Sequence, residues 1–481
     1  MTFINDIKQE QSCTYTENGA LALSTTQDVL ADLFATAGAL RRREESEIEQ
    51  KFAKAMIADP LLATKLSFYT RDVRGGLGER RTGRIFWRYL AKAYPEILRR
   101  NLALIGEFGR YDDLIALLDI QPAMVTSFIQ EQLQKDLQAM KEDKPVSLLA
   151  KWLPSVNTSS PETVNNARRL AKGLHMSEKE YRKVLSALRK YLKVTEVSLS
   201  AKDYDSIAYP EVPSLAMNRY RHAFYTHDEE RFKAYLESVQ KGEAKINASV
   251  LYPYDIVEKY LYQTNDIDPV LEAQWEALPD YTEGDERFLI VADVSGSMWG
   301  RPMATSVGLA IYFAERNKGP FANHFMTFSA RPELVEVKGE TLRDKIIYVQ
   351  NAEWTMNTDL EAAFMLVLKT ALRNHTPADE LPTSLVIISD MEFDYCTEGK
   401  LFYDEMKERY AKAGYKLPNV VFWNVNSRQD TYHASFDTPG VQLASGQSPH
   451  VFETLVKGVN LTPYQYMLEV LNDPRYERIT V

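Results

Sequence analysis

Cysteine is nearly absent from this chain, because only Cys13 and Cys396 occur among its 481 residues. Two isolated cysteines exclude a disulfide framework and a cysteine-based zinc motif, and they are typical of a reducing cytosol. Long apolar runs are lacking too, since no stretch approaches the roughly 20 residues that a membrane-spanning helix needs. The first residues show no basic segment followed by an apolar one, so we expect no signal peptide. We therefore predict a cytoplasmic protein without a membrane partner.

Positive charge is scarce overall but concentrated in one block. The formal net charge of the chain is −10. Residues 51–200 carry a net charge of +10, whereas residues 201–280 carry −7 and residues 281–481 carry −8. A basic block inside an acidic chain is a hint about partners, and it leaves open a polyanion, a basic protein that binds the acidic part, or docking of the two parts on each other.

The first part of the chain is predicted to be helical. Apolar residues recur at helical spacing through residues 27–250. Ser177 and Asp228 stand where helix N-caps are expected, each followed by acidic residues. Many helix pairs joined by short loops predict a stacked, HEAT-like array of helices over residues 1–280.

The pattern changes near residue 280. Short apolar runs at 287–295, 322–330, 383–390 and 419–426 alternate with helical segments. Near-continuous apolar strands between helices predict a parallel sheet covered on both faces. Residues 281–481 are therefore expected to form a doubly wound α/β domain, in which ligands bind at the carboxyl ends of the strands. The predicted fold is thus an α-helical array followed by an α/β domain.

Oxygen-bearing side chains follow two of the expected strands. The first strand runs into DVSGS, which places Asp293, Ser295 and Ser297 at alternate positions, and Asp390 ends a later strand. Thr358 lies where a loop enters a helix. Carboxylates and hydroxyls suit a hard divalent cation, so we expect these five residues to bind Mg²⁺, with Mn²⁺ as an alternative. The competing explanation is that they are turn formers and helix caps.

The densest basic stretch is a glycine-broken loop that enters a helix. Backbone N–H groups of such a loop and flanking guanidinium groups suit phosphate. The alternative is a solvated loop whose arginines pair with acidic neighbours. Residues 167–193 form a second basic segment, which equally fits the polar face of amphipathic helices. The candidate RNA-binding residues of the first stretch are Arg71, Arg74, Arg80, Arg81, Arg84 and Arg88.

The oxygen pattern resembles the metal-ion-dependent adhesion site of von Willebrand factor A (vWA) domains. In that family D-x-S-x-S is followed by a Thr at the head of a helix and by an Asp after a strand, which correspond to Asp293, Ser295, Ser297, Thr358 and Asp390. The chain departs from many members in MNTDL, where glycines usually precede the Thr.

A helical array followed by such a domain resembles the TROVE architecture of Ro ribonucleoproteins, and more closely an uncharacterised prokaryotic and viral branch. The stretches that carry this likeness include TENGALALSTT, RDVRGGLGERR, YPEVPSLAMNRY and PYQYMLEVLNDPRYERI. The resemblance implies a ring of helices that holds structured or misfolded RNA.

We therefore expect a non-enzymatic RNA-binding protein whose metal site adds an anionic contact. The alternative is a metal-dependent scaffold that grips an acidic residue of a protein partner, in a viral or mobile-element assembly. Glu392 and Asp394 leave a nuclease-like carboxylate set as a further alternative. No small-molecule substrate is indicated.

Overall fold

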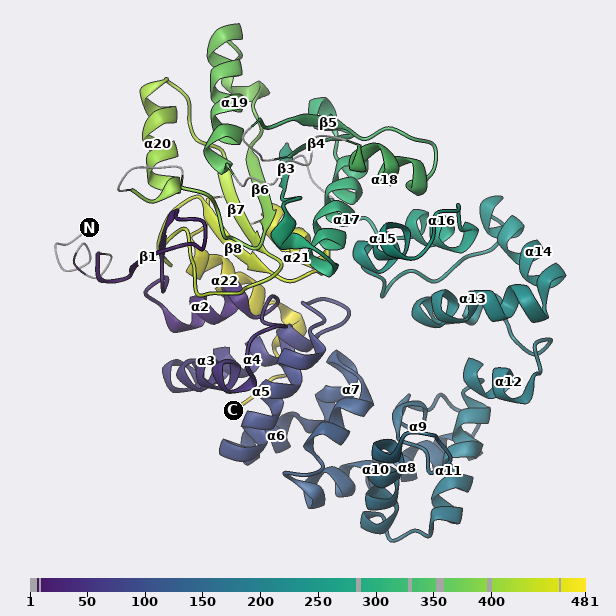
Figure 1. Cartoon of the computed structure of the whole chain (residues 1–481). Coiled ribbons are helices and arrows are strands. Elements are labelled where there is room, and N and C mark those ends of the chain that lie inside the picture. Colours follow the sequence, from purple (N-terminus) through teal and green to yellow (C-terminus); the bar gives the residue numbers. More distant parts are fainter. Residues whose placement is uncertain are drawn as a thin grey trace.

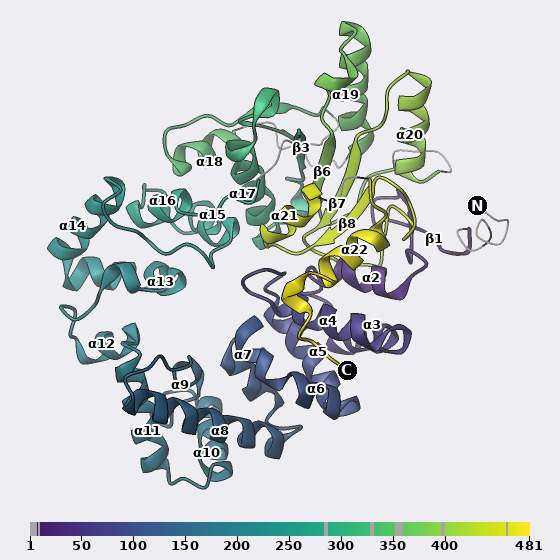
Figure 2. The same ribbon diagram turned by 180° about the vertical axis from the view of Figure 1, so that it is seen from behind.

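The helical part of the molecule runs around a ring. The computed structural model describes residues 7, 10–282, 287–327, 331–351, 359–395, 400–457 and 460–481. Figures 1 and 2 show the helices of the first 280 residues leaving the α/β domain, circling and returning to it. The helices are α2 (Val29–Thr36), α3 (Glu45–Ala58), α4 (Pro60–Arg71), α5 (Arg80–Ala93), α6 (Pro95–Asn101), α7 (Ile105–Phe108), α8 (Pro122–Lys141), α9 (Leu149–Trp152), α10 (Pro161–Gly173), α11 (Glu178–Tyr191), α12 (Thr195–Ala201), α13 (Ser214–His227), α14 (Glu229–Gln240), α15 (Pro253–Tyr262) and α16 (Pro269–Glu276).

Helix starts follow local capping chemistry. Ser177 caps α11 as predicted: its Oγ accepts a hydrogen bond from the Glu180 backbone N–H at 3.2 Å, and its own N–H donates to the Glu180 carboxylate at 2.8 Å. Asp228 precedes α14 as predicted, but its side chain makes no capping bond. Its carboxylate accepts instead from the Tyr209 hydroxyl at 2.6 Å.

A six-stranded sheet forms the centre of the α/β domain. Its order is β5-β4-β3-β6-β7-β8, and every neighbouring pair is parallel except β4 and β5. The four predicted strands are confirmed as β3, β4, β6 and β7. The strands are β3 (Phe288–Ala292), β4 (His324–Thr327), β5 (Leu334–Glu336), β6 (Ser384–Ser389), β7 (Asn419–Asn424) and β8 (Val441–Ser445).

Helices cover both faces of the sheet, as expected for buried parallel strands. Phe288 and Ile290 of β3 join the core that contains α17, α18, α21 and α22. Leu289 and Val291, which point the other way, pack with α19 and α20. These helices are α17 (Arg301–Arg316), α18 (Leu342–Gln350), α19 (Leu360–Asn374), α20 (Phe402–Lys412), α21 (His450–Lys457) and α22 (Pro463–Leu471).

The far end of the helical array packs closely against the α/β domain and the start of the array. A Cβ added at Gly308 of α17 would lie 3.2 Å from Pro253 of α15. A Cβ at Gly78, in the loop before α5, would lie 2.1 Å from the Tyr252 hydroxyl oxygen. These approaches close the ring.

Both ends of the described chain are fastened to distant segments. The hairpin β1 (Cys13–Tyr15) and β2 (Leu21–Leu23) lies beside the sheet, where Leu23 forms a bridge with Tyr432. The last residues return to the first helices, and the Asn101 side chain exchanges hydrogen bonds with Thr480.

One apolar core runs through helices α2–α11, α15 and α16 and the α/β domain. The predicted fold class is confirmed. The boundary between residues 280 and 281 stays a prediction. Within the described residues, no helix combines the length and apolarity needed to cross a bilayer.

Candidate functional site

The two predicted carboxylates lie where the direction of the sheet reverses. From β3 the chain moves to β4 and β5 on one side, and then returns to β6, which lies on the other side of β3. Asp293 follows β3 and Asp390 follows β6, so both stand at the carboxyl ends of adjacent parallel strands. This topological switch point is where open α/β sheets bind ligands.

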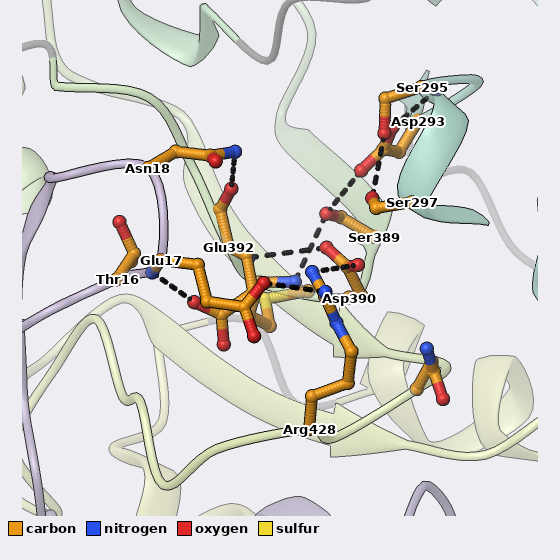
Figure 3. A network of polar contacts seen from close by, with 12 residues as sticks. Thr16, Glu17, Asn18, Asp293, Ser295, Ser297, Ser389, Asp390, Glu392 and Arg428 are labelled. Carbon is orange, nitrogen blue, oxygen red and sulfur yellow. Dashed lines mark hydrogen bonds and ion pairs between the residues drawn. The ribbon is translucent and has the colours of Figure 1, made fainter.

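Asp293 is held by short bonds inside the protein (Figure 3). It is 0% exposed, and its Oδ2 accepts a hydrogen bond from Ser389 Oγ at 2.6 Å. Its Oδ1 accepts from the Ser295 N–H at 2.9 Å. Burial, and then the nearby charge of Asp390, raise the pKa of Asp293 to about 6.

Two hydroxyls complete the described part of the oxygen set. Ser295 Oγ and Ser297 Oγ lie 3.0 Å apart at the start of the loop after β3. The structure thus brings Asp293, Ser295, Ser297 and Asp390 to one edge of the sheet (Figure 3). Thr358, the fifth predicted ligand, lies outside the described residues.

This donor set fits a hard divalent cation. Asp293 and Asp390 are 0% and 1% exposed, and the repulsion between their charges is relieved when a cation lies between them. Among the described residues, no group of three or more His, Cys, Asp or Glu side chains is arranged to hold a metal. A cation here would therefore depend on two carboxylates assisted by hydroxyls.

Arg428 and Glu17 are functional candidates that sequence patterns did not indicate. Arg428 follows β7, and its Nη2 lies 2.9 Å from Asp390 Oδ2. Its Nη1 lies 2.5 Å from Glu17 Oε2 (Figure 3). Glu17 belongs to the turn between β1 and β2, hundreds of residues away in sequence. No local signal could have connected the two.

Glu392 fastens this N-terminal turn to the sheet. It is 1% exposed, and its Oε2 accepts a hydrogen bond from the Glu17 N–H at 2.7 Å. Its carbonyl oxygen accepts from the Asn18 side chain at 2.7 Å. Asp394 forms a backbone bridge with Gly19. Both carboxylate residues therefore contact the N-terminal turn.

The six candidate arginines mostly contact oxygen atoms of neighbouring helices. Arg71 is 2% exposed and its Nε lies 2.8 Å from Asp113 Oδ2, so the expected RNA contact does not hold for this residue. The other contacts are Arg74 with the Glu107 carbonyl at 2.6 Å, Arg80 with Asp112 at 2.5 Å, Arg81 with the Arg43 carbonyl at 2.9 Å, Arg84 with Asp113 at 2.6 Å and Arg88 with Asp119 at 2.8 Å. Arg71, Arg80, Arg84 and Arg88 thus pair with acidic neighbours, as in the alternative, whereas Arg74 and Arg81 bond to backbone carbonyl oxygens.

The second basic segment has more unpaired charge. It comprises α10 and α11, which lie on the ring away from the sheet (Figure 1). Apolar residues such as Leu170 and Leu185 are buried, so the charged side chains face solvent. Six exposed cations form no ion pair within the part of the chain that the structure describes: Lys172, Lys179, Arg182, Lys183, Lys190 and Lys193. We call these six residues the basic helical face.

Comparison with known families covers nearly the whole chain. Residues 16–121 and 122–282 match the family described as "Domain of unknown function (DUF2828)", which is more than half of the chain. The chain belongs to the DUF2828 family. Residues 288–471 of this DUF2828 protein also match "Domain of unknown function (DUF7788)".

Two individual proteins resemble this DUF2828 chain over most of its length. "Uncharacterized protein L728" of Acanthamoeba polyphaga mimivirus is 27% identical over 502 residues, which cover 95% of this chain and 87% of the viral protein. The crystal structure of the Deinococcus radiodurans RO (RSR) protein superposes with a TM-score of 0.50 and 13% identity, covering 90% of this chain and 100% of the other. At that identity the likeness establishes a shared fold.

Proposed function

We propose that this DUF2828 protein is a non-enzymatic RNA-binding protein of Ro type, which holds structured or misfolded RNA on its helical ring. A divalent cation, Mg²⁺ or Mn²⁺, held by Asp293, Ser295, Ser297 and Asp390 together with Thr358, supplies an added contact to an anionic group. The shared fold with a Ro protein supports this proposal.

The observation that carries the proposal is the basic helical face. Its cations stand on or just after adjacent helices and form no ion pair among the described residues. Unpaired surface cations raise the local potential and attract phosphates, because each phosphate contact releases condensed counter-ions. Paired cations, such as those of residues 80–88, have less to gain from a phosphate.

An exposed aromatic pair gives a second support. Trp299 follows the Ser297 loop and is 72% exposed. Its ring centroid lies 5.4 Å from that of Tyr262. Exposed aromatic faces stack on unpaired bases of any sequence.

Charge removal tests the proposal. We expect K172Q/R182Q/K183Q/K190Q to bind a structured RNA at least about tenfold more weakly at ~50 mM salt, because several phosphate contacts are lost. The slope of log K against log salt should fall by about 0.9 for each lost contact. Filter binding across a salt series measures both quantities.

A matched variant removes the same charge elsewhere. K233Q/K338Q/K400Q/K412Q alters four lysines that are at least 45% exposed and that form ion pairs distant from the basic helical face. We expect it to bind RNA like the unaltered protein. Equal weakening by both variants, or no binding of structured RNA by the unaltered protein, contradicts the proposal.

A second candidate is a scaffold that binds an acidic residue of a protein partner through a cation at the edge of the sheet. We call this edge, formed by Asp293, Ser295, Ser297 and Asp390, the cation edge. The observation that favours this scaffold is that Arg428, beside Asp390, already holds a carboxylate, that of Glu17. Asp293→Ala should then abolish capture of a protein partner while RNA affinity stays unchanged.

A further inference from the structure

Arg428 lies between a buried carboxylate and a partly exposed one. Its side chain is 28% exposed, that of Asp390 is 0% exposed and that of Glu17 is 35% exposed. The Asp390 carboxylate is buried at the edge of the sheet, whereas the Glu17 carboxylate is partly exposed and bonds to the side chains of Arg428 and Gln429. The Glu17 contact is therefore the one that can exchange.

Two buried hydrogen-bond donors on the loop after β7 have no acceptor among the described residues. Arg428 Nε is buried and has no acceptor among the described residues. Asn426, on the same loop, is 3% exposed, and its Nδ2 also has no acceptor in the described part of the chain. A buried N–H without a partner is costly, and an anionic oxygen is the group that satisfies it best.

A cation bound at the cation edge would also attract an anion to the Arg428 loop. A divalent cation on Asp293 and Asp390 would draw an anion to the side on which Arg428 stands. Glu17 already brings one carboxylate to that side. The Glu17 carboxylate thus occupies the position in which the loop could bind another anion.

We propose that Arg428 and its loop form an anion-binding site for an RNA phosphate, and that Glu17 is an internal competitor which the phosphate displaces. This inference rests on the proposed function, since it names the contact that RNA makes at the cation edge. The exchange replaces one ion pair of Arg428 by another and breaks no covalent bond. The N-terminal turn thereby lowers the affinity for weak anions and leaves the site to multivalent ones.

A mutant cycle tests the competition. Binding of a short single-stranded oligouridine in the presence of Mg²⁺ at ~50 mM salt is measured by fluorescence anisotropy. We expect Glu17→Gln to bind about three- to tenfold more tightly and Arg428→Gln about tenfold more weakly, as is usual when one charge of a contact is removed. The double variant should bind like Arg428→Gln alone, because the competition that we propose is for the Arg428 guanidinium.

Two variants control for the general loss of a surface charge and for instability of Arg428→Gln. Glu229→Gln removes a charge from an exposed ion pair with Lys233, on the far side of the ring, and should leave oligouridine binding unchanged. Arg428→Lys keeps the positive charge and should retain part of the affinity if Arg428→Gln proves unstable.

Each outcome of these measurements either supports or overturns the proposed competition at Arg428. No tightening by Glu17→Gln, or tightening that persists without Arg428, overturns the competition. Binding of a polyglutamate peptide in place of oligouridine, dependent on Arg428, overturns the assignment to RNA. If structured RNA binds through the basic helical face but Glu17 has no effect, this inference fails alone. If no RNA binds at all, it fails together with the proposed function.

Discussion

Individual side chains set the charge balance at the carboxyl edge of the sheet. The buried carboxylates of Asp293 and Asp390 repel each other. Arg428 forms an ion pair with Asp390, and the same guanidinium also forms an ion pair with Glu17. A cation between the two aspartates relieves the repulsion at its source. The same edge therefore carries two buried carboxylates and an arginine, which are the groups that the proposed cation and anion would contact.

Cation binding should stabilise the protein through Asp293. At a hundredfold excess of Mg²⁺ or Mn²⁺ over its dissociation constant, we expect about 2.7 kcal/mol of added stability in urea unfolding. Asp293→Asn should abolish this gain, because it removes a charged ligand. Asp437→Asn, the same change at an exposed position, should keep it. A gain that survives Asp293→Asn argues against the assigned ligand.

His433 should make stability depend on pH. The residue is 1% exposed, its Nε2 lies 3.0 Å from the Met391 carbonyl oxygen, and burial lowers its pKa to about 4. The unfolded chain takes up a proton near pH 6.5 and the folded chain only near pH 4, so this contribution is lost as the pH falls between them. We expect a loss of up to about 1.4 kcal/mol per pH unit.

The matched measurement follows urea unfolding at several pH values. His433→Gln keeps a donor for the Met391 carbonyl and should flatten the profile between pH 4 and 6.5. His222→Gln alters an exposed histidine and should leave the profile unchanged. Identical profiles for His433→Gln and the unaltered protein would show that His433 does not cause the dependence.

At the scale of elements, the sequence predicted the strands whose residues are all buried. The strands β3, β6 and β7 are buried on both faces, and their continuous apolar runs follow directly. β5 has three residues with alternating exposure, and it pairs only with β4, so no run marks it. Asp293 and Asp390 were predicted because each follows such a run. Glu17 and Arg428 required knowledge of which distant segments meet.

The C-terminal segment forms an ion pair with the buried carboxylate of Asp72. The Arg475 guanidinium donates to both carboxylate oxygens of Asp72, which is 0% exposed, and the Tyr476 hydroxyl donates to the same carboxylate at 3.0 Å. Arg475→Ala should cost about 2–3 kcal/mol in urea unfolding, since it leaves a buried charge with poorer compensation.

The neighbouring arginine provides the comparison. Arg478 pairs with Glu107 at 2.7 Å, but both side chains are about half exposed or more, at 63% and 48%. Arg478→Ala should therefore cost less than about 1 kcal/mol. Equal costs for the two substitutions would show that the burial of Asp72 does not decide the difference.

At the scale of the whole molecule, the ring closes by contacts between segments far apart in sequence. The alternation of helical and β-rich segments predicted the two kinds of architecture but not their closure. Closure combines the shared apolar core with close approaches such as that of Gly78 to Tyr252, and neither the pairing of distant segments nor such an approach has a periodic signal. The proposed function depends on closure because the ring fixes where the basic helical face stands.

A methyl group at residue 78 should loosen the ring. Gly78 has a φ of +67°, and a Cβ there would lie 2.1 Å from the Tyr252 hydroxyl oxygen. We expect Gly78→Ala to lower stability and to raise the radius of gyration in small-angle X-ray scattering. Tyr252→Phe in the same chain should restore part of the loss, because it removes the atom that clashes. A double variant no better than the single one would assign the whole effect to backbone strain.

The fastening of both chain ends has a consequence for synthesis. The turn that contains Glu17 leaves the ribosome long before its partners at residues 392–432, and at ordinary rates of translation it waits roughly 20 to 80 seconds for them. Asp72, at the end of α4, waits about as long for the C-terminal segment that binds it. These contacts of the two chain ends therefore form only after almost the whole chain has left the ribosome.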